Sequence, residues 1–198
     1  MKRKGFTLAE VLIALLVVGI VAALVAPTIS KIMPNREKIF VIKAYKSLHE
    51  TTSMLLTEPS FYLNGTTKGL EDTAECADPD FSGAPYQGNN KFCNLLMKNM
   101  NNFSENLATS GKADWVTADF MAWTCQYKSS NNTASIIVDI NAEEKPNCSY
   151  NASNCKLPDQ YLFTVETDGN IVANDKLTKV YLNSMERLND KKADYNEL

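Results

Sequence analysis

Residues 4–12 read Lys-Gly-Phe-Thr-Leu-Ala-Glu-Val-Leu, and this short stretch governs how the rest of the chain is interpreted. The basic residues Lys2, Arg3 and Lys4 lead into it, and residues 11–30 contain no charged side chain. As an α-helix that segment would rise about 30 Å, which matches the hydrocarbon core of a bilayer. Positively charged flanks stay on the cytoplasmic side of a membrane, so the rest of the chain is expected on the far side.

Three kinds of N-terminal segment begin in this way: a removable secretory signal, a plain membrane anchor, and a leader that is cut off ahead of a retained helix. Glu10 separates them, because a carboxylate at the start of an apolar segment is costly in lipid and needs a partner. Neither a secretory signal nor a simple anchor has a use for such an acid. A secretory signal also ends in a small-residue cleavage site, which residues 24–26 match poorly. The third kind is favoured, with the plain anchor as the main alternative.

Residues 4–12 resemble the cleavage and methylation motif of type IV prepilins and type II secretion pseudopilins: basic residues, a glycine, a phenylalanine, and an acid four places later. The resemblance implies that a prepilin peptidase removes residues 1–5 by cutting between Gly5 and Phe6. It implies that the same enzyme methylates the new N terminus at Phe6. It also implies that Glu10 meets the amino terminus of a neighbouring subunit during assembly.

This role for Glu10 has a physical basis. Cleavage before Phe6 creates an ammonium group, and in a bundle of such helices the Glu10 carboxylate of another subunit can neutralise it. A buried charge left without a partner costs several kcal/mol. A wrong axial register would leave both charges unpaired, so the pair would set the stagger between subunits.

Gly19 and Pro27 lie inside the apolar segment. Glycine is a weak helix former and proline removes a backbone donor, so a simple bend is one interpretation. Many pilins carry a glycine and a proline at these places, and the stretch between them can unwind in the filament. The resemblance therefore makes residues 19–27 a candidate helix-melting segment.

The resemblance further implies partners and a location. The partners would be prepilin peptidase, copies of itself or other pilin-like subunits, an inner-membrane assembly platform, and the membrane. Before assembly the chain would cross the bacterial inner membrane once with its N terminus in the cytoplasm, and afterwards it would lie in a periplasmic or extracellular filament. We find no Ser/His/Asp, Cys/His or phosphate-binding pattern in the sequence, so we expect no enzyme and no catalytic residue.

The implied fold is α+β and type IV pilin-like, with one long N-terminal helix packed on a small antiparallel sheet. The helix is expected over residues 6–58, with a transmembrane half at about residues 8–30, and it should end before Pro59. A globular head would follow over residues 59–198. An apolar stripe at helical spacing is predicted to pack against this head: Val41, Tyr45, Leu48, Thr52 and Leu55.

Within the head, residues 64–113 are rich in Asn, Gly, Asp and Pro and are predicted to be mostly loop, with a short helix near residues 91–100. Strands are expected from about residue 115 to residue 173, and Asp168-Gly169 marks a tight hairpin turn. We predict three or four antiparallel strands, in residues 119–127, 134–140, 161–165 and 171–172. A last short helix is expected at residues 177–188.

The chain has five cysteines, all beyond the apolar segment and so on the side of the membrane where disulfides persist. The short spacings favour the pairs Cys76–Cys93 and Cys148–Cys155, although Cys125 could displace either member of the second pair. The odd count leaves at least one cysteine unpaired or paired to another chain. No spacing reads Cys-x-x-Cys, so zinc is not expected.

A looser resemblance to pseudopilin-like proteins runs from Asp139 to residue 163, with Ala142 where glycine is usual. Some secretion pseudopilins bind calcium near this sheet, and the oxygen atoms of Asp139, Asn141 and Asp159 are weak calcium candidates. The EF-hand pattern fails, because Glu144 stands where its glycine should be. A polar turn is the favoured interpretation, so no cofactor is expected.

Two classes of function remain open: a structural subunit of a pilus or secretion pseudopilus, and a minor pilin whose head binds DNA or a surface. Binding DNA would need exposed basic residues on the head. The formal net charge is −3, and loss of Lys2, Arg3 and Lys4 would make it −6, so a nucleic-acid partner is not expected. The head lysines available for such a role include Lys91, Lys98, Lys112 and Lys128.

Overall fold

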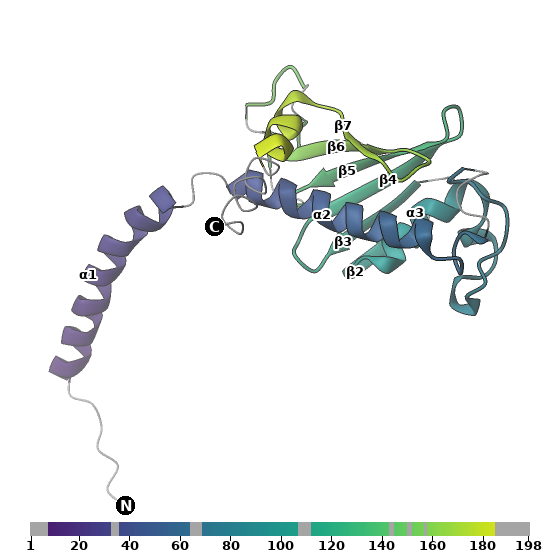
Figure 1. Cartoon of the computed structure of the whole chain (residues 1–198). Coiled ribbons are helices and arrows are strands. Elements are labelled where there is room, and N and C mark those ends of the chain that lie inside the picture. Colours follow the sequence, from purple (N-terminus) through teal and green to yellow (C-terminus); the bar gives the residue numbers. More distant parts are fainter. Residues whose placement is uncertain are drawn as a thin grey trace, which may run out of the picture. The chain divides into compact units, whose positions relative to one another are not determined.

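The computed structural model describes residues 8–32, 36–63, 69–106, 112–142, 145–149, 152–156 and 158–184 (Figure 1). The chain forms two units, residues 1–36 and residues 37–198. The first contains helix α1, and the second, the head, contains a sheet and the helices that pack on it.

Helix α1 spans Leu8–Ile32 and runs without interruption through Gly19 and Pro27. Its side chains from Leu8 to Leu24 are all exposed, although most are leucine, isoleucine, valine or alanine. A helix that is apolar on every side normally lies inside a larger assembly or a membrane.

Among the described residues, none of the helices reaches the combined length and apolar character required of a membrane span. The transmembrane half predicted at about residues 8–30 stays a prediction.

Helix α2 spans Arg36–Thr57 and carries the predicted apolar stripe. Its buried residues are Val41, Ala44, Leu48, Thr52 and Leu55, which confirms four of the five stripe positions, while Tyr45 is half-buried with its ring 6.2 Å from that of Phe163. The helix ends one residue before Glu58, as expected ahead of Pro59. Residues 33–35 lie outside the described residues, so a single helix over residues 6–58 stays a prediction.

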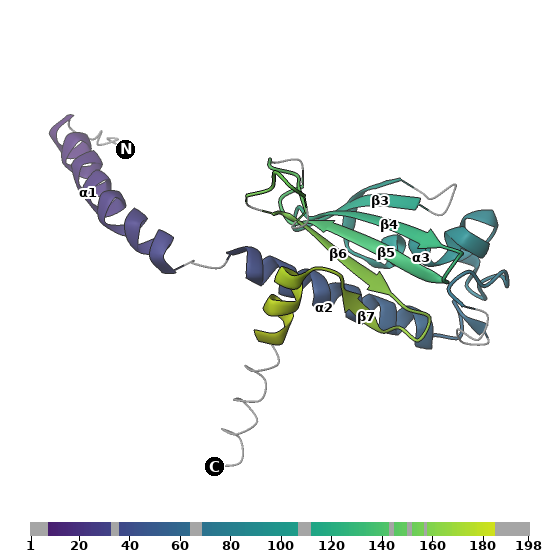
Figure 2. The ribbon, with the colours of Figure 1, turned by 90° about the horizontal axis from the view of Figure 1, so that it is seen from above.

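Within the described residues the sheet has six antiparallel strands in the order β2-β3-β4-β5-β6-β7, so each of these strands pairs with its neighbour in the sequence (Figures 1 and 2). The α+β, pilin-like arrangement predicted from the sequence is therefore present. The strands are β2 (Asn102–Asn106), β3 (Lys112–Thr117), β4 (Ala122–Lys128), β5 (Thr133–Asp139), β6 (Gln160–Val165) and β7 (Ile171–Ala173).

The prediction of three or four strands was too low, because β2 and β3 were missed. Their sequences, Asn-Phe-Ser-Glu-Asn and Lys-Ala-Asp-Trp-Val-Thr, are polar and lack a run of β-branched residues. Such strands form because they pair with a neighbour already in place, and β-propensity alone does not predict them. The region assigned mostly to loops, residues 64–113, therefore contains β2 and the start of β3.

The same region contains three short 3-10 turns, η1 (Pro79–Phe81), η2 (Ala84–Tyr86) and η3 (Gly88–Asn90), which lead into helix α3 (Lys91–Asn99). The predicted helix at residues 91–100 is present. Its residues 91–97 are all buried, so α3 is a core element of the head.

Alternate residues of β4, β5 and β6 are buried, as expected for a sheet that covers a core on one face. Trp123, Ile136 and Phe163 are examples, and each is at most 2% exposed. Helix α2 lies across this face (Figures 1 and 2). After β7 a short helix occupies residues 176–184, where Asp175 accepts a hydrogen bond from the backbone N–H of Thr178 and caps the helix. The rest of the helix predicted to residue 188 lies outside the described residues.

Candidate functional site

The N-terminal motif contributes Glu10 to the first turn of α1. An acid at this place interacts favourably with the partial positive charge of a helix N terminus, so the helix tolerates Glu10 well. The Glu10 side chain is exposed. Gly5 and Phe6, the predicted cleavage and methylation sites, lie outside the described residues.

The candidate melting segment, residues 19–27, is helical in this structure. A Cβ atom at Gly19 would meet no heavy atom within 4 Å, so the glycine is not required by a close contact within the chain. Gly19 would instead matter because glycine is a weak helix former, or because another chain packs closely against it. Unwinding between Gly19 and Pro27 in a filament stays a prediction.

The structure corrects one predicted disulfide. Cys93 pairs with Cys125, not with Cys76, across 32 residues of sequence and with Cα atoms 5.5 Å apart. Both residues are fully buried, Cys93 on α3 and Cys125 in the middle of β4, so the bond ties α3 to the sheet. Cys76 stays a buried free thiol, with Sγ 3.9 Å from the carbonyl oxygen of Phe61. Sequence spacing indicated the wrong partner because the docking of α3, not the chain distance, brings the sulfurs together.

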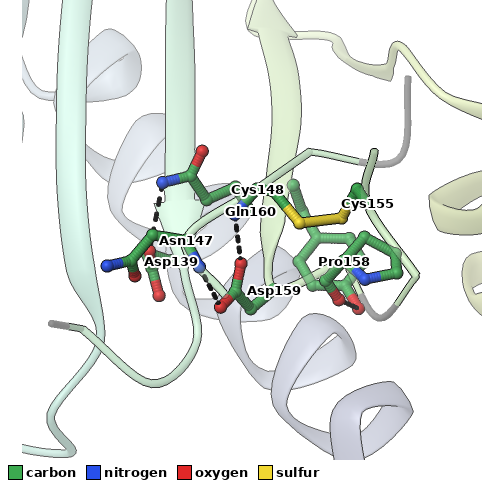
Figure 3. The surroundings of a disulfide bond; sticks show 8 residues. Asp139, Asn147, Cys148, Cys155, Pro158, Asp159 and Gln160 are labelled. Atoms are coloured by element: carbon green, nitrogen blue, oxygen red, sulfur yellow. Dashed lines mark hydrogen bonds between the residues drawn. A yellow bond between two sulfur atoms is a disulfide. The ribbon is translucent and has the colours of Figure 1, made fainter. Parts of the chain in front are cut away.

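The second disulfide joins Cys148 to Cys155 in the connection between β5 and β6. Beside it, Asp159 lies immediately before β6 and is 4% exposed. Its Oδ2 accepts the backbone N–H of Asn147 at 2.8 Å, and its Oδ1 accepts that of Cys148 at 2.7 Å (Figure 3). The carboxylate therefore fixes the first half of the disulfide loop on β6.

The other two calcium candidates belong to the same turn. Asp139 accepts hydrogen bonds from the backbone N–H of Asn141 and from Nε2 of Gln160, each at 3.2 Å. Burial, helped by the charge of Asp159, raises the pKa of Asp139 above its usual range. Oδ1 of Asn141 is buried and makes no hydrogen bond with any described residue.

The described residues contain no cluster of three His, Cys, Asp or Glu side chains that could hold a metal ion. Each oxygen atom of Asp159 already accepts one backbone N–H. The geometry is thus that of a hydrogen-bonded turn, and calcium binding gains no support from it. Ala142 has φ of 58°, in the left-handed region that favours glycine.

Lys91 is fully buried, which removes it from the lysines that could contact DNA. Its Nζ donates to the carbonyl oxygen of Ala74 at 2.8 Å, lies 3.6 Å from Oδ2 of Asp72, and stands 4.7 Å from the centre of the Tyr62 ring. The amino-acid composition of the loop that precedes α3 gives no indication that this loop folds over Lys91. Lys98 and Lys128 are exposed, and the Lys112 side chain lies outside the described residues.

A second polar cluster, which sequence analysis missed, lies between α2 and the β3–β4 turn. Lys43 forms an ion pair with Asp119 at 2.8 Å, Thr117 Oγ1 donates to Asp119 Oδ1, and Trp123 Nε1 donates to Thr117 Oγ1 at 3.1 Å. Burial alone would raise the pKa of Asp119, but the hydrogen bonds and the charge of Lys43 hold it below its usual range. Beside it Phe120 is 68% exposed with φ of 62°. Lys43 and Asp119 are 76 positions apart, so no local pattern could have revealed the pair.

A family model described as the prokaryotic N-terminal methylation motif matches residues 1–26. The match includes Gly5, Phe6, Glu10 and Gly19, and the whole head lies outside it. No curated protein and no solved structure matches the chain.

Proposed function

We propose, on the premise that its N-terminal methylation motif marks this chain as a type IV pilin-like or pseudopilin-like protein, that it is a structural subunit of a pilus or of a type II secretion pseudopilus. The motif indicates a prepilin-like subunit that prepilin peptidase processes and that assembles with pilin-like subunits. In our proposal the peptidase cuts between Gly5 and Phe6 and methylates Phe6.

The observation that carries the proposal is the placement of one acid on an otherwise apolar helix. Glu10 lies in the first turn of α1, and the described side chains beyond it to Leu24 are uncharged and exposed. A helix of this kind gains stability by packing its apolar surface against other helices or lipid, at about 25 cal/mol for each Å² removed from contact with water. The head supplies its own core, so α1 is the part of the chain that needs partners.

The chemistry of assembly follows from the new amino terminus. Once Phe6 is the first residue, its ammonium group lies about one helical turn from Glu10, at the same end of the apolar segment. Two such helices at the correct stagger place the ammonium of one near the carboxylate of the other. Every other stagger removes the partner on the neighbouring subunit, and a charge left unpaired in an apolar bundle costs several kcal/mol. The pair would thus select one axial register.

The test compares Glu10→Ala with Glu50→Ala, an identical substitution of an exposed acid on α2. Both variants are expressed as the full chain, and filaments are sheared off and quantified. We expect Glu10→Ala to abolish assembly while the chain still accumulates in the membrane, and Glu50→Ala to assemble as the wild type does. Unchanged assembly of Glu10→Ala would refute the proposed pairing.

Mass spectrometry of the mature wild-type chain provides the second measurement. We expect a methylated N terminus at Phe6. A start near Thr28 would identify an ordinary secreted protein, and an intact Met1 would identify a plain anchor.

A further inference from the structure

The exposed charged side chains at the two ends of the head are mainly of opposite sign. We call the end at which α2 begins the base and the end at which it ends the tip. The strand registers identify both: Ala122, Asp139 and Gln160 are opposite one another at the base, and Lys128 is opposite Thr133 at the tip. The β5–β6 connection and the helix at residues 176–184 lie at the base, whereas the loops after α2 lie at the tip (Figures 1 and 2).

The base is basic. Lys156 lines a cavity there with Glu37 of α2 and with Leu177 and Tyr181 of the last helix, which brings three separate segments to one surface. The lysines of this surface are Lys38, Lys145, Lys156, Lys176 and Lys179, of which all but the half-buried Lys38 are exposed.

Most described acids at the base are buried or paired with a cation. Asp139, Asp159 and Asp175 are each at most 6% exposed, and Asp119 pairs with Lys43. Glu37 is exposed and reduces the positive charge in part. Glu143 and Glu144 lie outside the described residues.

The tip is acidic. Residues 69–90 contain no lysine or arginine, and the loop that they form lies against the end of α2, where the backbone N–H of Ala77 donates to the carbonyl oxygen of Ser60. The β6–β7 turn at Asp168 lies at the same end, beside Thr57. The acids of this surface are Glu58, Glu71, Glu75, Asp78, Asp80 and Asp168.

Hydrogen bonds within the head do not neutralise three of these acids. Asp78 accepts from the backbone N–H of Asp80, Glu75 accepts from Gln87, and Asp168 accepts from the backbone N–H of Asn170. All three donors are uncharged, so the negative charge stays on the surface. Lys128, the last residue of β4, is an exposed cation at this end.

We propose that the acidic tip of one subunit docks on the basic base of the next copy of this chain, an inference that rests on the proposed filament function. Both complementary surfaces belong to one head but lie at opposite ends of α2, so they cannot satisfy each other within a chain. A second copy displaced along the α2 axis brings them together. Contacts between two different surfaces of the same chain propagate without closing, which is the symmetry of a filament.

The same charges also fix polarity. Two heads placed base to base or tip to tip would bring like charges together, which is unfavourable. Each exposed ion pair by itself contributes little affinity. The main effect of such pairs is to orient subunits and to speed correct encounters. The apolar helix would therefore supply the strength of assembly, and the head would supply its direction.

The first test is a zero-length carbodiimide cross-link in filaments of the full chain, assembled from a mixture of nitrogen-14 and nitrogen-15 subunits. We expect mass spectrometry to find amide bonds between Lys156, Lys176 or Lys179 of one isotope and Glu75 or Asp80 of the other. Their yield should fall as salt is added before the reagent, because salt screens exposed charges. Cross-links only within one chain, or only to a different protein, would overturn the proposal.

The second test is a charge swap. The base variant Lys156→Glu/Lys179→Glu and the tip variant Glu75→Lys/Asp80→Lys should each reduce the yield of filaments about tenfold, given the loss of two or more ion pairs and the new repulsion. A chain with all four substitutions should regain most of the yield. A structural defect in either variant would not be rescued in this way, so failure of the rescue would count against the proposal.

Lys128→Glu is the matched control, because it adds an acid to the tip and should leave the yield undiminished. If the wild type assembles through Glu10 and all the charge variants assemble equally well, the docking contact is wrong and the proposed function stands. If the wild type forms no filament with Glu10 intact, both are wrong.

Discussion

Helices α1 and α2 are similar in length, 25 and 22 residues, but they place their apolar side chains in opposite situations. In α2 most of the apolar residues form one stripe, in which Val41, Leu48 and Leu55 are completely buried, although Ile39 is 65% exposed. In α1 they cover every side, and Leu12 and Leu16 are 58% and 64% exposed. The apolar surface of α2 is therefore covered by the head, whereas that of α1 is left open by the residues that the structure describes.

Because of this difference, we expect α2 to contribute to the folding of the head and α1 to contribute to assembly. Substitutions in α2 and the sheet should act on the folding of the head, because these side chains pack against one another inside it. Substitutions in α1 should act on assembly, because its side chains are available to pack against other molecules. The same residue type, leucine, is thus expected to have two different phenotypes depending on the helix that carries it.

The largest expected effect on folding comes from the disulfide between α3 and β4. Replacing Cys93 and Cys125 together by alanine should lower the free energy of unfolding of the head by about 3–4 kcal/mol, since the bond closes a long loop in the unfolded chain. Urea unfolding of the full chain in detergent, followed by tryptophan fluorescence, measures this change. Cys76→Ala is the matched control, and because Cys76 forms no disulfide it should cost clearly less. An equal loss in the two variants would contradict the assigned pairing.

A smaller effect tests the comparison between the two helices directly. Leu48→Ala should lower the free energy of unfolding of the head by about 3 kcal/mol, because it leaves a cavity in a packed core. Leu16→Ala, the same substitution in α1, should leave that free energy within about 0.5 kcal/mol of the wild type. Leu16→Ala should instead lower the yield of filaments. Equal destabilisation by the two substitutions would show that the comparison is wrong.

Features encoded by neighbouring residues could be predicted from the sequence. The motif around Glu10 is local, the buried stripe of α2 follows from helical spacing, and Asp168-Gly169 forms a hairpin turn in which Gly169 has φ of 85°. These local patterns were enough to predict the fold class, because none of them depends on which distant segments come together in space.

Features that depend on long-range packing could not be predicted. Cys93 meets Cys125 only because α3 docks on β4, and Lys91 is buried only because the loop after α2 folds over it. Strand β2 has a polar sequence and exists through its pairing with β3. The segregation of charge between base and tip likewise emerges only when residues 38, 145, 156 and 179 are brought to one surface.

The smallest expected effect concerns the ion pair that joins α2 to the β3–β4 turn. Asp119→Asn should lower the free energy of unfolding of the head by about 1 kcal/mol at pH 7, a modest value because both side chains are partly exposed. The pKa of Asp119 is depressed in the folded state, so its stabilising contribution is present above the usual aspartate pKa of about 3.9 and is lost as the pH falls through the depressed value. The difference between wild type and Asp119→Asn should therefore shrink toward zero in strong acid. A double-mutant cycle with Lys43→Met isolates the pair, and a coupling that persisted after acidification would show that the contact is not electrostatic. Glu10→Ala, measured in parallel, should leave the stability of the head unchanged at either pH, because in our proposal its carboxylate acts between chains, whereas that of Asp119 acts within one.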